Sequence, residues 1–436
     1  MARDQSDSTP IRGRDDLVAW FEEGCKADGE LRAGSEHEKF PFYRGGLSPV
    51  SYEPQGIRAL LEGMAARTGW TPIMEDDHPI GLFDSVGGGA ISLEPGGQFE
   101  LSGAPLATVH ETAAELAKHL DDLKAVAKPL GIGFLALGMS PIWTRAETPK
   151  MPKRRYDIMT AYMPKVGSLG LDMMYRTSTV QVNLDFTSEA DMVEKVRVSL
   201  ALQPIATALF ANSPFTEGKL NGMRTQRSAI WLDTDNDRAG MLPFAFEDGM
   251  GFERYVDYAL DVPMYFVKRG DHYHDVAGAS FRDLLKGKLA ALPGERATIS
   301  DWANHLSTIF PEVRLKRYLE MRGSDVGPAP MIAAQAAFWI GLLYDRASLD
   351  QALQLIREWS PDDRQTLREK VPKLALQATI AGRSVRDVAR DALQLARDGL
   401  KRRGRLDSLG RNETRFLTPL DSIVTANETQ ADRLIK

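Results

Sequence analysis

The sequence predicts a mixed α+β protein whose C-terminal part is helical. Residues 179–186 alternate strictly between polar and apolar side chains, which is the pattern of a strand with one buried face. Residues 108–128 place apolar side chains at helical spacing behind a capping-box motif at Thr108. Beyond Gly327 a helical periodicity rich in leucine and arginine continues to about Gly404. These patterns indicate an α+β body followed by helices.

Other segments fit the same fold class. Residues 54–68 and 188–210 have helical patterns, and the second begins with the Ser-Glu-Ala-Asp cap expected at a helix start. A short helix is expected at residues 15–26, a strand at 35–42 and an apolar run at 132–137. A basic, loop-rich stretch follows at 141–171, and an alternating strand is expected at 312–322. Because 436 residues exceed the usual size of one core, we expect a polar tail (1–14), an α+β body (15–326) and a helical part packed on it (327–436).

Composition and charge narrow the range of functions. The chain carries 54 basic and 60 acidic residues, a formal charge of −6, which predicts neither a nucleic-acid nor a membrane-surface partner. Residues 1–16 are polar and lack the apolar core of a secretory signal, and no apolar run reaches membrane-spanning length. The single cysteine, Cys25, cannot form an internal disulfide and fits a reducing compartment. We therefore expect a cytoplasmic protein.

Four segments place polar side chains at alternate positions. Side chains two apart on a strand point to the same face, about 7 Å apart. The residues that share a face within their own segment are Glu36 and Glu38; Gln98 and Glu100; Gln181, Asn183 and Asp185; and Lys316, Tyr318, Glu320 and Arg322. A solvated face is the alternative for each strand taken singly. Because these side chains are mostly carboxylates, amides and arginines, with few solvating lysines, a shared functional surface is favoured.

Several glutamates would crowd together if these strands share one sheet: Glu36, Glu38, Glu94, Glu100 and Glu320. Two carboxylates about 7 Å apart repel by about 2 kcal/mol at an effective dielectric constant near 20. Such a surface needs cations, and oxygen ligands suit Mg²⁺, which binds carboxylates together with substrate phosphates. Arg155, Arg227 and Arg322 would bind phosphates or substrate carboxylates. The sequence has no GxxxxGK[ST] loop, so a P-loop nucleotide site is not expected.

Five strings in the sequence resemble the plant-type glutamate–cysteine ligases, a family also found in proteobacteria. They occupy residues 34–40, 93–103, 181–186, 208–218 and 310–323, and include Gly-Ser-Glu-His-Glu-Lys-Phe and Arg-Tyr-Leu-Glu-Met-Arg-Gly. The likeness runs from about residue 15 to residue 410. It implies a curved antiparallel sheet related to the glutamine-synthetase catalytic domain, with flanking helices and the active site on the concave face.

The resemblance also implies an activity. Members of this family use ATP to join the γ-carboxylate of L-glutamate to the amine of L-cysteine through γ-glutamyl phosphate, the first step of glutathione biosynthesis. Mg²⁺ is the metal implied, with Mn²⁺ as the alternative. Two other functions stay open: a carboxylate–amine ligase of the same fold that takes another amine, and a non-catalytic nucleotide-binding protein.

Site residues are carried over by matching motifs. The metal ligands implied are Glu36, Glu38, Glu94, Glu100, Gln181 and Glu320. The catalytic residues implied are Glu320, Arg155 and Arg322, the last as a phosphate contact. The substrate-binding residues implied are Arg155, Arg227, Asn183, Trp231 and Tyr265. Asp185 is the residue considered as a base for the cysteine amine.

The chain departs from the plant enzymes of this family in two respects. A chain with Cys25 as its single cysteine cannot form their regulatory disulfides. A plastid-targeting extension like theirs is also not expected. Redox-switched dimerisation is therefore not carried over, and we expect a bacterial cytoplasmic enzyme of the proteobacterial branch.

Overall fold

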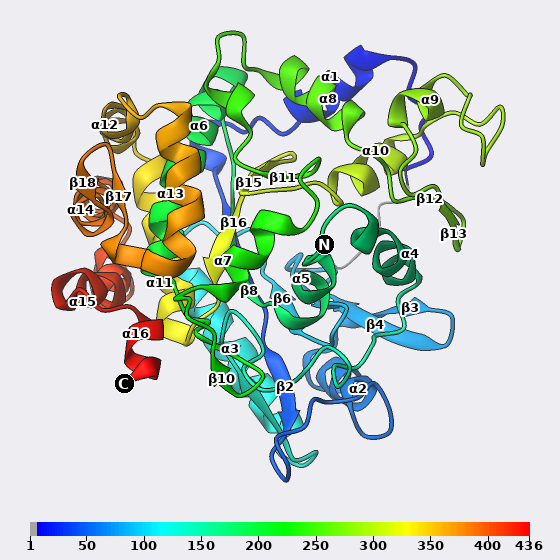
Figure 1. Ribbon diagram of the computed structural model, residues 1–436, viewed down its shortest axis with the longest axis horizontal. Helices are drawn as coiled ribbons and strands as arrows, with labels where there is room; N and C mark the ends of the chain where they lie inside the picture. The colour runs from blue at the N-terminus through cyan, green and yellow to red at the C-terminus, as the bar shows by residue number, and fades with distance from the viewer. Residues whose placement is uncertain (1–6) are drawn as a thin grey trace.

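An eight-stranded antiparallel sheet runs through the centre of the molecule (Figure 1). The structure is a computed structural model that describes residues 7–436. The strand order is β15-β16-β8-β1-β6-β5-β4-β3, so strands far apart in the sequence are neighbours in the sheet. The strands are β1 (Ala33–His37), β3 (Thr71–Glu75), β4 (His78–Phe83), β5 (Ala90–Leu93), β6 (Phe99–Ser102), β8 (Thr179–Leu184), β15 (Val313–Leu315) and β16 (Leu319–Asp325).

Within residues 7–436, ten further strands form two-stranded sheets: β2 (Phe40–Tyr43) with β7 (Ile132–Leu135), β9 (Phe215–Thr216) with β10 (Lys219–Leu220), β11 (Ala239–Gly240) with β14 (Phe310–Pro311), β12 (Phe266–Arg269) with β13 (His272–Asp275), and β17 (Thr379–Ile380) with β18 (Arg383–Ser384). The strand predicted at residues 35–42 is therefore divided, because β2 leaves the central sheet to pair with β7. The single strand predicted at residues 312–322 is wrong. The chain turns back there as a hairpin, closed by a hydrogen bond from the Lys316 N–H to the Tyr318 carbonyl (2.8 Å).

Helices surround the sheet and account for most of the C-terminal part. Their bounds are α1 (Arg14–Glu22), α2 (Ile57–Thr68), α3 (Val109–Ala127), α4 (Arg154–Tyr162), α5 (Gly170–Arg176), α6 (Glu189–Leu209), α7 (Gln226–Ile230), α8 (Phe252–Asp261), α9 (Phe281–Leu285), α10 (Ile299–Leu306), α11 (Ala329–Leu343), α12 (Arg346–Ile356), α13 (Pro361–Leu374), α14 (Val385–Arg403), α15 (Thr418–Ala426) and α16 (Gln430–Ile435). The helices predicted near residues 15, 54, 108 and 188 are confirmed. The basic stretch 141–171 contains α4, which the sequence patterns did not predict.

The apolar face of the central sheet is covered by helices along its length. Val180, Val182 and Leu184 of β8 pack in one cluster with buried side chains of α6 and α11. Strands β4, β5 and β6 pack against α2 and α3 in a second cluster. Helix α11 is buried from Met331 to Leu343, as its nearly continuous apolar sequence requires. The opposite face of the sheet is left for polar side chains.

The C-terminal helices gather on one side of the molecule (Figure 1). Helices α11 and α14 meet there at two glycines, Gly341 and Gly399, so closely that a Cβ on either would collide with the other backbone. A Cβ on Gly341 would lie 2.2 Å from the carbonyl oxygen of Ala396. This crossing joins α14 to the helix that covers β8 and β1. The domain division at residue 326 stays a prediction, and part of the expected tail lies outside the described residues.

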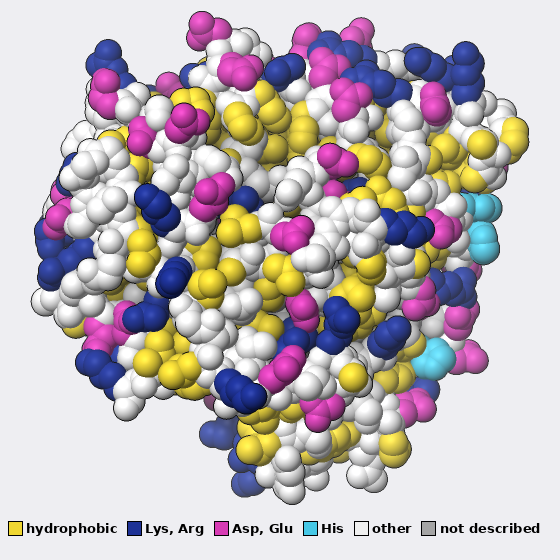
Figure 2. Space-filling view, in the orientation of Figure 1, with side chains coloured by type: hydrophobic (Ala, Val, Ile, Leu, Met, Phe, Trp, Pro, Cys, Tyr) yellow, Lys and Arg dark blue, Asp and Glu magenta, His cyan; other side chains and the backbone are white. Residues whose placement is uncertain are grey.

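The surface shows no broad area of one charge in the view of Figure 2, where acidic and basic side chains are interspersed. Within residues 7–436, no helix combines the length and the apolar character needed to cross a membrane.

Replacing Gly341 with alanine should lower the midpoint of thermal unfolding by several degrees. The added Cβ forces α11 and α14 apart, and overpacking of this kind costs about 2 kcal/mol. Gly29→Ala is the control, because nothing lies within 4 Å of a Cβ at that position. Equal melting temperatures for the two variants would show that the helices can separate at little cost.

His305 in α10 should make stability depend on pH. Burial lowers the pKa of His305 to about 4, although its Nε2 donates a hydrogen bond to the Ala259 carbonyl (2.8 Å). Below the ordinary pKa of 6.5, the His305 imidazole binds a proton in the unfolded chain but stays neutral in the folded chain. The stability of the fold therefore falls as pH falls. Between pH 7.5 and 5.5, the free energy of unfolding of the wild type should fall by about 1 kcal/mol more than that of His305→Gln. A constant difference in melting temperature across this range would contradict the prediction.

Candidate active site

The register between neighbouring strands places the polar side chains on one face of the central sheet. Glu36 in β1 lies directly opposite Gln181 in β8, and Asn183 in β8 lies opposite Glu320 in β16. Directly opposed residues of an antiparallel pair point to the same side. Glu100 belongs to this face too, because it stands two residues from the partner of Glu36 in β6. The alternation in the sequence therefore predicts the shared face correctly.

A cavity opens on this polar face, bordered by β1, β6, α4, α5 and α7. Most of the residues predicted from the sequence line it: Glu36, Glu38, Glu94, Glu100, Arg155, Gln181, Arg227, Trp231 and Arg322. The cavity also has an apolar wall that the sequence patterns did not identify: Tyr156, Met159, Met173, Met174 and Phe310. Charged groups thus face a partly apolar pocket, the kind of setting in which small substrates bind.

Glu94 is held in the cavity by a tight turn between β5 and β6. The Glu94 N–H bonds to the Gln98 carbonyl (3.0 Å), and the Gly97 N–H bonds to the Glu94 carbonyl (2.9 Å). Gly97 has a φ of +84°, a conformation that side chains other than glycine's disfavour. The Gln98 side chain donates to the Thr177 carbonyl (2.8 Å) and fixes the turn beside α5. The string Glu-Pro-Gly-Gly-Gln is therefore built to present Glu94.

The acidic half of the polar face carries Glu36, Glu38 and Glu100 in buried positions. Their hydrogen bonds come from neutral donors: the Asn183 amide to Glu36 (2.7 Å), the Thr179 N–H to Glu38 (3.0 Å), and the Ser92 hydroxyl to Glu100. Burial raises the pKa of Glu36, with Glu320 and Glu100 adding to it. Burial likewise raises the pKa of Glu38 well above its usual range, with Glu94 and Glu100 adding to it. The ionised forms of Glu36 and Glu38 are thus disfavoured without a cation.

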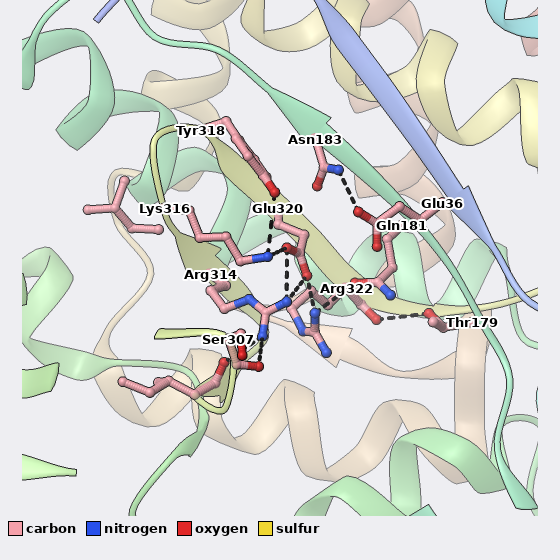
Figure 3. A network of polar contacts seen from close by, with 12 residues as sticks. Glu36, Thr179, Gln181, Asn183, Ser307, Arg314, Lys316, Tyr318, Glu320 and Arg322 are labelled. Carbon is pink, nitrogen blue, oxygen red and sulfur yellow. Dashed lines mark hydrogen bonds and ion pairs between the residues drawn. The ribbon is translucent and has the colours of Figure 1, made fainter. Parts of the chain in front are cut away.

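The basic half of the polar face centres on Glu320, which is completely buried (Figure 3). Its carboxylate accepts hydrogen bonds from Arg314 (2.6 and 3.0 Å), Lys316 (2.7 Å) and Arg322. Burial disfavours the charge, but these three cations outweigh it and hold the pKa of Glu320 well below its usual range. Burial, with Arg314 nearby, lowers the pKa of Lys316 to about 8. One carboxylate therefore orders three cations, of which Arg314 and Arg322 reach the cavity.

Arg227 and Trp231 enter the cavity from α7 and the 3₁₀ turn η3 (Trp231–Asp233). The Arg227 guanidinium is buried, lies 5.9 Å from the Trp231 ring and donates to the Arg322 carbonyl (2.9 Å). Its Nε has no hydrogen-bond partner within the described part of the chain. Arg155 reaches the cavity from α4, with its guanidinium 5.4 Å from the Phe266 ring. Both arginines are placed to bind an anionic group of a substrate.

Four of the site residues inferred from the sequence do not line the cavity: Asn183, Tyr265, Asp185 and Glu320, the last of which is completely buried among three cations. The Asn183 amide donates a hydrogen bond to Glu36 and so orients the Glu36 carboxylate. Tyr265 is buried against Arg238, 3.8 Å from the ring to the guanidinium, in the cluster behind α4. Asp185 lies beyond the end of β8 and accepts from the Arg32 N–H (2.8 Å). Tyr265 and Asp185 therefore contact other parts of the protein and not the cavity. Tyr156 forms the aromatic wall in place of Tyr265.

The sequence patterns placed Lys316 on the shared face without a role, and they did not indicate Arg314 as a site residue. Interpreted as one strand, residues 312–322 gave no reason to place Arg314 near Glu320. The hairpin places Arg314 directly opposite Glu320. No local signal marks this hairpin, because Arg314, Lys316 and Arg322 converge on Glu320 only after the chain has turned back.

The donor set suits a hard divalent cation, since Glu36, Glu38, Glu94 and Glu100 offer only oxygen atoms. The raised pKa values of Glu36 and Glu38 point the same way, because a bound cation would favour their ionised forms. As they stand, however, no three acidic, histidine or cysteine side chains among residues 7–436 are close enough to coordinate one ion. The oxygen donors of the site therefore fit a hard cation in their chemical type, but not in their present spacing.

The chain is similar to characterised plant proteins over nearly all of its length. It is 56 % identical over 423 residues to the chloroplastic glutamate–cysteine ligases of Nicotiana tabacum and Arabidopsis thaliana, covering 97 % of this chain and 79 % of each relative. It is 55 % identical over 422 residues to the chloroplastic glutamate–cysteine ligase B of Oryza sativa subsp. japonica, covering 97 % of this chain and 83 % of the relative.

These relatives correct the expected location. The chloroplastic location in all three names contradicts a cytoplasmic protein. The expectation rested on Cys25 as the single cysteine, which indicates a reducing environment without identifying the compartment. The assignment to a proteobacterial branch stays a prediction.

A solved structure shares the fold. The glutamate–cysteine ligase of Francisella tularensis, in complex with AMP, aligns with a TM-score of 0.52 at 13 % identity, covering 93 % of this chain and 84 % of that one. This confirms the α+β fold class predicted from the sequence, with a large antiparallel sheet at its centre.

The family assignment rests on a match across the whole sheet and the C-terminal helices. The model of glutamate–cysteine ligase family 2 (GCS2) matches residues 32–436, a span that contains each of the strands and the cavity described above. The resemblance seen in the five strings of the sequence is confirmed by this match and by the plant relatives. The chain belongs to glutamate–cysteine ligase family 2.

Proposed function

We propose that the acidic half of the polar face binds Mg²⁺ and that the basic half binds the phosphates of ATP, with glutamate held between them. The chain is an ATP-dependent glutamate–cysteine ligase, which catalyses the first step of glutathione synthesis. The observation that supports this division of the site is the segregation of charge. The carboxylates come from β1 and the residue that follows it, from the β5–β6 turn and from β6, whereas the cations come from the β15–β16 hairpin.

A triphosphate fits between these halves on electrostatic grounds. Its negative charge would pair with Arg314 and Arg322, which reach the cavity and share Glu320 with the buried Lys316. Lys316 and Arg314 have lowered pKa values because they are buried, so an anion placed beside them would stabilise their charged forms. The metal, when bound by Glu36, Glu38, Glu94 and Glu100 with Gln181 beside them, would neutralise the phosphates and the entering γ-carboxylate. Glu320 would act by holding the three cations with which it is paired, and not as a metal ligand.

The chemistry needs positioning and charge stabilisation more than covalent participation. The γ-carboxylate of glutamate attacks the terminal phosphorus of ATP, ADP leaves, and γ-glutamyl phosphate forms. The cysteine amine then attacks the acyl carbon, loses a proton and expels phosphate. Arg322 would stabilise the transferring phosphoryl group. Arg155 and Arg227 would hold substrate carboxylates, with Trp231 as a wall.

Glu38→Gln should abolish turnover while raising stability. Burial and the neighbouring carboxylates raise the pKa of Glu38, so a carboxylate at this position opposes folding of the metal-free protein at neutral pH, and the neutral amide removes that cost. ADP release dependent on glutamate and cysteine should fall by at least about 10²-fold. The melting temperature, measured with a chelator present, should stay equal or rise. Near-normal ADP release would remove Glu38 from the metal site.

Glu320→Gln should also abolish turnover, but with the opposite effect on stability. It leaves Arg314, Lys316 and Arg322 buried without their shared carboxylate, and breaking a buried ion pair costs about 3–5 kcal/mol. The melting temperature should therefore fall where that of Glu38→Gln does not. An unchanged melting temperature would show that the three cations do not depend on Glu320.

A further inference from the structure

Helix α7 carries Arg227 into the cavity, yet it is too short to hold itself in place. It has five residues, Gln226–Ile230, and continues into the η3 turn that carries Trp231. Isolated helices of this length are not stable, so the position of Arg227 depends on contacts from outside the helix. Two sets of contacts, one at each end of the α7–η3 segment, supply them.

The first end of α7 is fixed to the end of β16 by Asp325, which is completely buried. Its carboxylate accepts from the Thr225 hydroxyl (2.9 Å) and the Ser213 hydroxyl (2.7 Å). Thr225 is the N-cap of α7 and accepts from the Ser228 N–H (3.2 Å). Ser213 accepts from the backbone N–H of Arg227 (3.3 Å). Asp325 therefore holds the residue that starts the helix and the one that contacts Arg227.

Helix α13 contacts the same end. The Pro372 carbonyl, in the last turn of α13, accepts from the N–H groups of Arg224 (2.8 Å) and Thr225 (3.0 Å). Carbonyl groups in the last turn of a helix lack a partner within the helix, and the start of α7 supplies one. The C-terminal helices thus contact the substrate-binding segment directly.

The second end of the segment is fixed by Arg368, also from α13. Its Nη2 donates to the Trp231 carbonyl (3.0 Å), and its Nε pairs with Glu312 (2.8 Å). The Glu312 carbonyl in turn accepts from the Arg322 N–H (3.1 Å). The Arg368 side chain is buried, so these hydrogen bonds are shielded from water. One side chain links the C-terminal helices to Trp231 and to the strand that carries Arg322.

We propose that Arg368 and Asp325 are positioning residues that clamp the α7–η3 segment and thereby set the affinity for glutamate. The inference rests on the proposed function, in which Arg227 binds a substrate carboxylate. Neither residue is among those that line the cavity, so their effect must pass through Arg227 and Trp231. An affinity set in this way affects the substrate and the transition state equally, and it therefore changes KM more than kcat.

The test compares two arginines of the same helix. Arg368→Gln should raise the KM for glutamate about tenfold, with kcat and the KM for ATP within about twofold of wild type. Arg364→Gln is the matched control: Arg364 is as buried as Arg368, but it stacks on Phe246 at 3.6 Å and donates to the Trp359 carbonyl, away from α7. It should lower the melting temperature and leave the KM for glutamate unchanged.

Asp325→Asn should act in the same direction as Arg368→Gln, because its amide nitrogen cannot accept hydrogen bonds as the carboxylate oxygens do. Hydrogen exchange of the backbone amides at residues 226–231 provides a readout without substrate. Exchange should speed up in Arg368→Gln and Asp325→Asn and stay unchanged in Arg364→Gln. Unchanged exchange in the first two variants, or a KM for glutamate equal to that of Arg364→Gln, would overturn the clamp.

Arg227→Gln separates failure of the clamp from failure of the proposed function. If Arg227 binds a substrate carboxylate, this variant raises the KM for glutamate more than Arg368→Gln does. An unchanged KM in Arg227→Gln would refute the proposed role of Arg227, and with it the link from the clamp to glutamate affinity. A raised KM in Arg227→Gln together with a normal KM in Arg368→Gln would refute the clamp alone.

Discussion

A shift of one residue between β1 and β8 would turn Gln181 and Asn183 into the apolar core and bring Val180 and Val182 onto the polar face. The apolar face of the sheet prevents that shift, because α6 and α11 bury β8 from behind. The same packing holds Glu36, Glu38 and Glu100 together although they repel one another. The proposed binding of cations would therefore depend on how firmly the opposite face is packed.

The sequence predicted the shared face because strict alternation has one simple interpretation, a half-buried strand. It could not predict the hairpin of β15 and β16. Residues 316–318 read Lys-Arg-Tyr, without the glycine, proline or asparagine that usually marks a turn. In the structure, attraction between Glu320 and the basic residues on both strands accompanies the turn. Such an interaction appears only once the partner strand is known.

The pocket walls show a second limit of sequence reasoning. Tyr265 and Tyr156 are both buried tyrosines near α4, and nothing local distinguishes the one that lines the cavity from the one that stacks on Arg238. The methionines of α4 and α5 would be assigned to a core by their apolar character. Which faces of α4 and α5 point to the cavity is decided by how these helices pack on the β5–β6 turn, and that depends on contacts distant in sequence.

The C-terminal helices illustrate why the site cannot be understood from its lining alone. Arg364 and Arg368 lie one turn apart on α13 and are equally buried. In sequence both resemble charges on an amphipathic helix. In the structure Arg364 covers Phe246, while Arg368 bonds to Trp231 and Glu312. A guanidinium with several donors in one plane can join elements that side chains with a single donor cannot. Because Glu312 in turn bonds to the strand of Arg322, the same contact connects the proposed glutamate-binding and phosphate-binding sides of the site.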